Sequence, residues 1–283
     1  MSTVKCYMTL GWAEAYAQGE AYRNAQLLIE TQELAGILSN PELRLVDARP
    51  SGEYSRVHLP GAVNLPAPAT ENLEANRQGF PLFPDQAQQL FRMVGINTAS
   101  RVVLYDDHGS RFATRVFYVL EFFGHARVQV LNGGFRKWQS EGRPTTTDVP
   151  PVAPGDFTPT PNPSRIATAQ WLSAHLKDPA VKVVDARSPA EYRGGHIPGA
   201  VNIEWTQTLE PGAIKTFLPS RQLEELFAES QVARDREVVS YCQMAVRGAE
   251  IYFVLRLLGY ERVRLYDGSW EDWSADQTLP VEK

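Results

Sequence analysis

The segment VVSYCQMAVRGAEIYFVL, residues 238–255, places a cysteine and an arginine where chemistry could occur. Cys242 follows a short apolar run, and four residues separate it from Arg247, after which a helix-like run begins. A tight loop between a strand and a helix can turn backbone N–H groups inward and bind an anion. The following helix adds its positive N-terminal end and Arg247 adds a permanent charge. We therefore expect the loop to favour the thiolate of Cys242 and to lower its pKa below the free value of about 8.5.

A thiolate in such a loop is suited to carrying one sulfur atom. It can attack the outer sulfur of a donor and keep that sulfur as a persulfide, whose negative terminus the same N–H groups can hold. A nucleophilic acceptor then removes the sulfur, which is covalent catalysis in two steps with ping-pong kinetics. The alternative interpretation is that Cys242 is a small buried hydrophobic side chain, as free cysteines often are.

The chain that must position this loop repeats itself. The block LRLVDARPSGEYSRVHLPGAVNL, residues 43–65, returns as VKVVDARSPAEYRGGHIPGAVNI, residues 181–203, so that Asp47 and Arg49 correspond to Asp185 and Arg187. Two later blocks also recur. Copies of about 120 residues are too long for the units of a solenoid and indicate two homologous domains.

Each copy has the pattern of an α/β domain. Short β-branched and apolar runs predict three buried strands per copy, at 43–46, 102–105 and 128–131 and at 181–184, 238–241 and 263–266. Amphipathic helical runs follow at 114–123 and 249–258, and Gly124 and Gly259 stand where these helices should end. Strands that alternate with helices favour a mainly parallel sheet flanked by helices. Ligands of such sheets bind beyond the carboxyl ends of strands, which is where Cys242 lies.

The repeat and the composition between the copies set the domain boundaries. We expect an N-terminal extension at residues 1–24, a first domain at 25–143 and a second domain at 164–283. Residues 144–163 form the connector, whose many prolines exclude helix and favour an extended chain.

The composition excludes several partners. A net charge of -5 argues against nucleic acid, which needs a basic face. The longest apolar runs fall short of the roughly 20 residues of a membrane span, so we expect no membrane insertion. The two cysteines, Cys6 and Cys242, lie far apart without a Cys/His cluster, so neither a disulfide framework nor a zinc site is expected. A free thiol fits the reducing cytoplasm.

These motifs resemble the rhodanese, or sulfurtransferase, superfamily. The resemblance rests on YRGGHIPGAVNI (192–203) with its partner YSRVHLPGAVNL (54–65), on the two VDAR blocks and on YDGSWEDW (266–273). The layout is similar to the tandem-domain thiosulfate and 3-mercaptopyruvate sulfurtransferases, in which the C-terminal domain is catalytic and the N-terminal domain is inactive. The same asymmetry is visible here, because Asp106 or Asp107 stands where the second copy has Cys242.

The resemblance implies a catalytic Cys242 and an Arg187 that grips the anionic donor. A structural ion pair of Arg187, with Glu191 as a candidate partner, is the competing interpretation, since the inactive copy has the same arginine as Arg49. Asp185 is expected to support the scaffold. Donor binding is expected from the loop residues Gln243, Met244, Ala245, Val246 and Arg247. His58 and His196 recur in both copies, so we expect turn histidines without a catalytic role.

The donor and the exact role stay open at this stage. The uncharged middle of CQMAVR leaves 3-mercaptopyruvate possible, while Arg247 favours the doubly charged thiosulfate. The acceptor would be cyanide or a thiol, including a thioredoxin-like protein, and no metal or organic cofactor is implied. A persulfide carrier or regulatory rhodanese module is the alternative. A Cys-dependent phosphatase or arsenate reductase is the weaker one, because family members with that chemistry have five residues between the Cys and the Arg.

Overall fold

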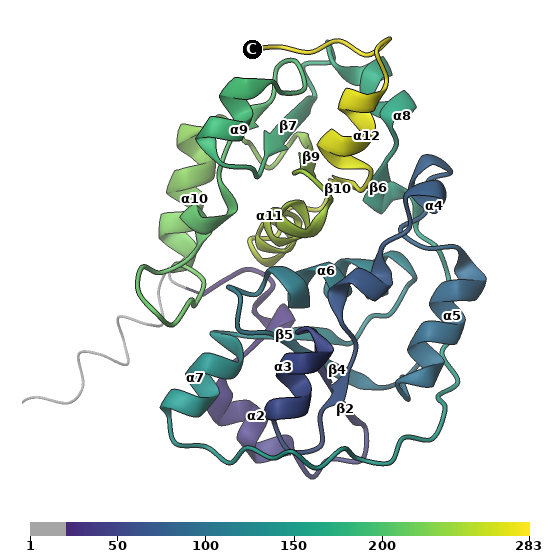
Figure 1. Ribbon diagram of the computed structural model, residues 1–283. Helices are drawn as coiled ribbons and strands as arrows, with labels where there is room; N and C mark the ends of the chain where they lie inside the picture. The colour runs from purple at the N-terminus through teal and green to yellow at the C-terminus, as the bar shows by residue number, and fades with distance from the viewer. Residues whose placement is uncertain (1–20) are drawn as a thin grey trace, which may run out of the picture.

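The computed structural model describes residues 21–283. Cys6 and most of the expected N-terminal extension lie outside this range. Two α/β domains follow one another along the chain and pack face to face, with helices α6 and α11 between them (Figure 1). Among residues 21–283, no helix has the length and apolar content that crossing a membrane requires.

Each domain contains one five-stranded sheet in which all paired strands are parallel. The orders are β1-β5-β4-β2-β3 and β6-β10-β9-β7-β8, so the second sheet repeats the topology of the first. The strands of the first sheet are β1 (Leu28–Ile29), β2 (Leu43–Asp47), β3 (Val63–Asn64), β4 (Arg101–Tyr105) and β5 (Val128–Leu131). Those of the second are β6 (Ile166–Ala167), β7 (Val181–Asp185), β8 (Val201–Asn202), β9 (Glu237–Tyr241) and β10 (Val263–Tyr266). The expected α/β class and the six expected strands are confirmed.

Helices cover both faces of each sheet. The first domain has α2 (Thr31–Ile37), α3 (Ser51–Arg56), α4 (Leu73–Arg77), α5 (Pro84–Met93), α6 (Arg111–Phe122) and α7 (Gly134–Ser140). The second has α8 (Ala169–His175), α9 (Pro189–Gly194), α10 (Ser220–Glu229), α11 (Val246–Leu257) and α12 (Ser269–Ala275). Short 3-10 turns are η1 (Ala25–Leu27), η2 (Ala67–Thr70), η3 (Pro163–Arg165) and η4 (Trp205–Thr208).

The alternation of side chains along β4 explains why both faces must be covered. Val103 and Tyr105 point into one core cluster with α2, α3 and α7, whereas Val102 and Leu104 point into another with α5 and α6. All four are fully buried, as expected for a central strand of a parallel sheet. The carboxyl end of β4, and likewise of β9, is therefore where the chain first leaves the core and can present a loop.

The two domains share one hydrophobic core. Helix α11 is buried on almost every side, and its Tyr252 and Phe253 meet Tyr118 and Phe117 of α6 edge to face, with ring centroids 5.0 and 4.9 Å apart. The Arg256 guanidinium crosses the interface to Glu121 at 3.0 Å. Because this contact continues each domain's own core, the domains are held as one unit with a fixed seam between them.

The connector is extended but bound to the first domain. Gly155 donates its N–H to Arg92 at 2.8 Å, Phe157 is buried against Phe91, and Thr160 donates to the carbonyl of Phe123. Residues 21–24 reach the second domain instead: Tyr22 donates to the carbonyl of Leu218 at 2.7 Å. The connector thus packs on the first domain before it enters the second, whereas the residues before the first domain bind the second directly.

Candidate active site

Cys242 lies in the loop that joins β9 to α11, and the start of α12 fixes this loop from behind. The Ser269 hydroxyl accepts the N–H groups of Cys242 and Ala245 at 3.3 and 3.0 Å and donates to the carbonyl of Tyr266. Trp270 donates its N–H to the carbonyl of Cys242 at 2.9 Å. Ala245 has the left-handed φ of 64° that turns the chain into α11. The loop is thus a tight bowl with Cys242 at its base.

The environment of Cys242 has two opposite effects on the pKa of its thiol. The charge of Arg247 lowers the pKa of Cys242, and the backbone N–H groups of Gly248, Met244 and Arg247, which point to the sulfur, lower it further. Burial is the larger effect and raises the pKa of the Cys242 thiol above its ordinary value, since only 1% of the residue is exposed. The expectation of a lowered pKa is therefore wrong for the protein without a persulfide on Cys242. The predicted inward-facing N–H groups of the loop are nevertheless present.

Arg247 does not offer a free positive charge. Its two terminal nitrogens donate to the two carboxylate oxygens of Glu191 at 2.8 and 2.7 Å. The Arg247 guanidinium, with help from Ser188, lowers the pKa of Glu191 to about 2. The cation nearest the loop is therefore already balanced by an anion from α9.

The first domain shows what such a loop binds. Asp106 occupies the position of Cys242, and its fully buried carboxylate accepts four backbone N–H groups. These come from His108 (2.8 Å), Ser110 (2.9 Å), Phe112 (2.7 Å) and Ala113 (2.9 Å). His108 and Phe112 correspond to Met244 and Gly248 of the second copy. The loop therefore turns N–H groups inward in both domains, and in the first domain these groups hold a carboxylate that is part of the chain.

The two loops differ in what lies above them. In the first domain, the Trp205 ring of η4 covers Gly109 so closely that an added Cβ would lie 2.8 Å from it. The Arg111 guanidinium lies 5.6 Å from the same ring. In the repeat, Ala67 stands at the position of Trp205. The loop that contains Cys242 thus lacks this cover, and a cleft adjoins it.

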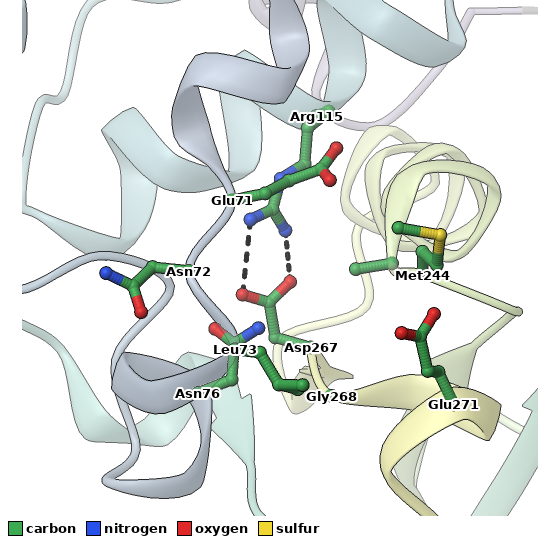
Figure 2. A pocket seen from close by; sticks show the side chains of 10 residues that line it. Glu71, Asn72, Leu73, Asn76, Arg115, Met244, Asp267, Gly268 and Glu271 are labelled. Carbon is green, nitrogen blue, oxygen red and sulfur yellow. Dashed lines mark hydrogen bonds and ion pairs between the residues drawn. The ribbon is translucent and has the colours of Figure 1, made fainter.

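That cleft lies on the seam between the domains and has a volume of about 230 Å³. Figure 2 shows the residues around it. The first domain contributes Glu71, Asn72, Leu73, Asn76 and Arg115, and the second contributes Met244, Ala245, Asp267, Gly268 and Glu271. A fully buried ion pair between Arg115 and Asp267 joins the two walls. The cleft is large enough for a small substrate only.

Of the loop residues expected to bind the donor, two line the cleft. Met244 is 52% exposed, and Ala245 is buried at the wall of the cleft. Gln243 and Val246 are half-buried and are not among the lining residues of the cleft. Arg247 faces Glu191 at the end of the loop.

Arg187 lies in a different place from the one expected of a donor-binding residue. It is 2% exposed, pairs with Asp185 at 2.6 Å and donates to the carbonyl of Gly195 at 2.8 Å. Arg49 and Asp47 make the equivalent pair in the domain without the cysteine, also at 2.6 Å. A scaffold role common to both domains explains this geometry. Glu191, the partner expected for Arg187 in that role, forms its ion pair with Arg247 instead. Asp185 also accepts the hydroxyl of Tyr241, in keeping with the support role expected of it.

The histidines of the repeat lie in the turns, as the comparison of the two copies predicts. His58 stacks on Tyr54 and His196 stacks on Tyr192, with ring centroids 3.9 and 3.7 Å apart. Each ring also bonds the carbonyl of the same tyrosine residue. Neither histidine lines the cleft.

One cluster has ligand types that a metal ion could use. Glu53, Asp107 and His108 place their ligand atoms within 4.8 Å of one another in the first domain. The His108 ring lies 3.2 Å from Glu53 and 3.1 Å from Asp107, and Arg49 lies 3.8 Å from the other oxygen of Asp107. These ion pairs account for the cluster without an ion.

Glu71, Glu271 and Ser269 were not among the residues predicted for the site, and Glu191 pairs with Arg247 rather than with Arg187. Ser269 belongs to the repeated GSWEDW block, which was a usable signal. Glu71 offered none, because it reaches the loop only through the packing of one domain on the other.

The comparisons with known proteins agree with this geometry. The Rhodanese-like domain family matches residues 30–141 and 168–276. A thiosulfate sulfurtransferase of Azotobacter vinelandii is 35% identical over 272 residues, which cover 92% of this chain and 98% of that protein. A sulfur carrier protein of Thermus thermophilus is 32% identical and covers 93% and 98%. A probable 3-mercaptopyruvate sulfurtransferase of Pseudomonas aeruginosa is 35% identical and covers 91% and 98%. The chain therefore belongs to the rhodanese family, as a tandem-domain sulfurtransferase.

Proposed function

We propose that this chain moves sulfane sulfur from a small anionic donor to cyanide or a thiol through a persulfide on Cys242. The observation that carries the proposal is the pair of loops. Two of the four N–H groups that hold the Asp106 carboxylate, those of His108 and Phe112, have counterparts in Met244 and Gly248 that point to Cys242. A bowl that satisfies an anion suits the thiolate, and it suits the negative terminus of the persulfide equally well.

The chemistry balances without a cofactor. The Cys242 thiolate forms a bond to the outer sulfur of thiosulfate, and the S–S bond of the donor breaks with its electron pair leaving on sulfite. Cyanide then bonds to the outer sulfur of the persulfide and departs as thiocyanate, while the electron pair returns to Sγ. Backbone N–H groups of Met244, Arg247 and Gly248 would hold the negative charge in both steps.

Thiosulfate is the donor we favour, with 3-mercaptopyruvate second. The relative from Azotobacter vinelandii supports the first and that from Pseudomonas aeruginosa the second. The charge of Arg247 supports thiosulfate less than the sequence implied, because Glu191 balances it. A thioredoxin-like acceptor and a cytoplasmic location belong to the same proposal, since turnover requires Cys242 as a free thiol.

The test is steady-state kinetics with thiosulfate and 3-mercaptopyruvate side by side and cyanide as acceptor. We expect thiosulfate to give the higher kcat/KM and the protein to gain the mass of one sulfur atom in the absence of cyanide. Cys242→Ser should keep the fold and abolish both the mass gain and the turnover. Sulfur loading that survives in Cys242→Ser would reject the site.

A persulfide carrier is the second candidate. The near-complete burial of Cys242 would protect a persulfide between partners, and the Thermus thermophilus relative is named a sulfur carrier. A carrier would load sulfur from the donor and show negligible turnover with cyanide. Rapid turnover would favour the enzyme.

A further inference from the structure

The charge of the cleft beside the Cys242 loop indicates which sulfur acceptors it admits. Two of its lining carboxylates, Glu71 and Glu271, make neither a hydrogen bond nor an ion pair with any of the described residues 21–283. They come from opposite domains, Glu71 from the segment after η2 and Glu271 from α12 (Figure 2). The cleft is therefore bounded on two sides by carboxylates to which no cation of the described residues is bonded.

Among the cleft residues that the structure describes, no cation is free to pair with these carboxylates. Among the described lining residues, Arg115 is the only cation, and its guanidinium pairs with Asp267 and bonds the carbonyl of Thr70. Arg247, at the end of the loop, is held by both oxygens of Glu191. Burial, with Asp267 and Glu271 adding to it and Arg115 opposing it, raises the pKa of Glu71. Glu71, Asp267 and Glu271 are thus close enough to interact across the cleft.

The remaining surface of the cleft is suited to a short hydrocarbon chain. Leu73 and Met244 line it from opposite domains and are 39% and 52% exposed, so both walls offer apolar surface to an occupant. A volume of about 230 Å³ accommodates a molecule of a few heavy atoms rather than a peptide. Met244 follows Cys242 by two residues, so an occupant lies beside the loop that would hold the persulfide.

We propose that Glu71 and Glu271 are specificity-determining residues that select a positively charged aminothiol as the sulfur acceptor. The inference rests on the proposed function, because it requires a persulfide on Cys242. The sulfur of the acceptor thiol forms a bond with the outer sulfur of the Cys242 persulfide anion, and the bond from that outer sulfur to Sγ breaks with its electron pair left on Sγ. The acceptor leaves as a persulfide that keeps the thiol proton, and Glu71 and Glu271 attract its ammonium group throughout.

The test uses three thiols of similar length and different charge: cysteamine, 2-mercaptoethanol and 3-mercaptopropionate. Thiosulfate is the donor, and wild type is compared with Glu71→Gln, Glu271→Gln and the double variant. Because the intrinsic reactivity of each thiol is the same for every variant, the change in kcat/KM isolates the charge of the cleft. Glu74→Gln is the matched control, since Glu74 is an exposed carboxylate of α4 that does not line the cleft.

We expect kcat/KM for cysteamine to fall about 3-fold in each single variant and about 10-fold in the double variant, as for partly exposed charge pairs. The value for 3-mercaptopropionate should rise, and the KM for thiosulfate should fall, while 2-mercaptoethanol and Glu74→Gln show changes within about 2-fold. Equal responses of cysteamine and 3-mercaptopropionate would overturn the inference. If the wild-type protein gains no sulfur atom from thiosulfate, the proposed function itself fails, which is a different outcome.

Discussion

Replacing Asp106 by asparagine tests whether the loop after the central strand is an anion site. The two carboxylate oxygens accept two N–H groups each: Oδ1 from His108 and Ser110, and Oδ2 from Phe112 and Ala113. Asparagine has the same shape but turns one of the two oxygens into an NH2 donor. Whichever way the amide is oriented, two backbone N–H groups then face another donor.

The magnitude follows from those two lost contacts. A buried donor without a partner costs about 1–3 kcal/mol, so Asp106→Asn should lower the free energy of unfolding by about 2–6 kcal/mol. Part of this cost will be recovered where the loop can shift toward water, because His108 and Phe112 are only half-buried. Trp205 above Gly109 limits that shift.

The assay is urea denaturation of the sulfur-free protein, followed by intrinsic fluorescence and circular dichroism. The matched control is Asp107→Asn, one residue along, where the same charge is removed. Asp107 has ion-pair contacts with Arg49 and His108 but accepts no backbone N–H group among the described residues, so we expect a change below about 1 kcal/mol, as for partly exposed ion pairs. Asp106→Asn with an effect as small as that of the control would refute the anion site, and with it the main argument for the Cys242 bowl.

Three further predictions concern the second domain. Cys242→Asp should be more stable than its neutral isostere Cys242→Asn by about 1–3 kcal/mol near neutral pH, because only the carboxylate satisfies the inward N–H groups; equal urea midpoints would contradict this. The rate of sulfur loading from saturating thiosulfate should increase with pH from neutral to above pH 9, since burial raises the pKa of Cys242 and the thiolate is the nucleophile; a rate that is flat over this range would show that the thiolate already dominates. The pKa of Glu191 is depressed from 4.5 to about 2, so its contribution to stability is complete above about pH 4.5 and is lost as the pH falls toward 2. Because Glu191 is partly exposed, we expect Glu191→Gln to lower the free energy of unfolding by only about 1 kcal/mol at pH 6. The difference from wild type should shrink as the pH falls toward 2, and a difference that does not change with pH would reject the ion pair as its source.

The sequence by itself determined the fold and the identity of the loop. Repeated β-branched runs predict the central strands, and Gly124 and Gly259, both with φ of 84°, end the helices as expected. The direction of the N–H groups in a six-residue loop depends mainly on local φ and ψ, so a bowl around Cys242 could be inferred from spacing alone. Its counterpart in the first domain was visible as an aspartate at the matching position.

Only the tertiary structure decided the electrostatics of that bowl. Whether Cys242 is exposed, whether Arg247 is free and which charges face the cleft all depend on residues distant in sequence, such as Glu191 and Glu71. The pKa of a buried thiol is set by the cost of removing its thiolate from water and by the nearby dipoles and charges that stabilise it, and packing decides which effect is larger. Packing likewise placed Trp205 over one loop and left a cleft beside the other. Local geometry therefore fixes that an anion is held, whereas the packing of the two domains fixes which molecules can reach it.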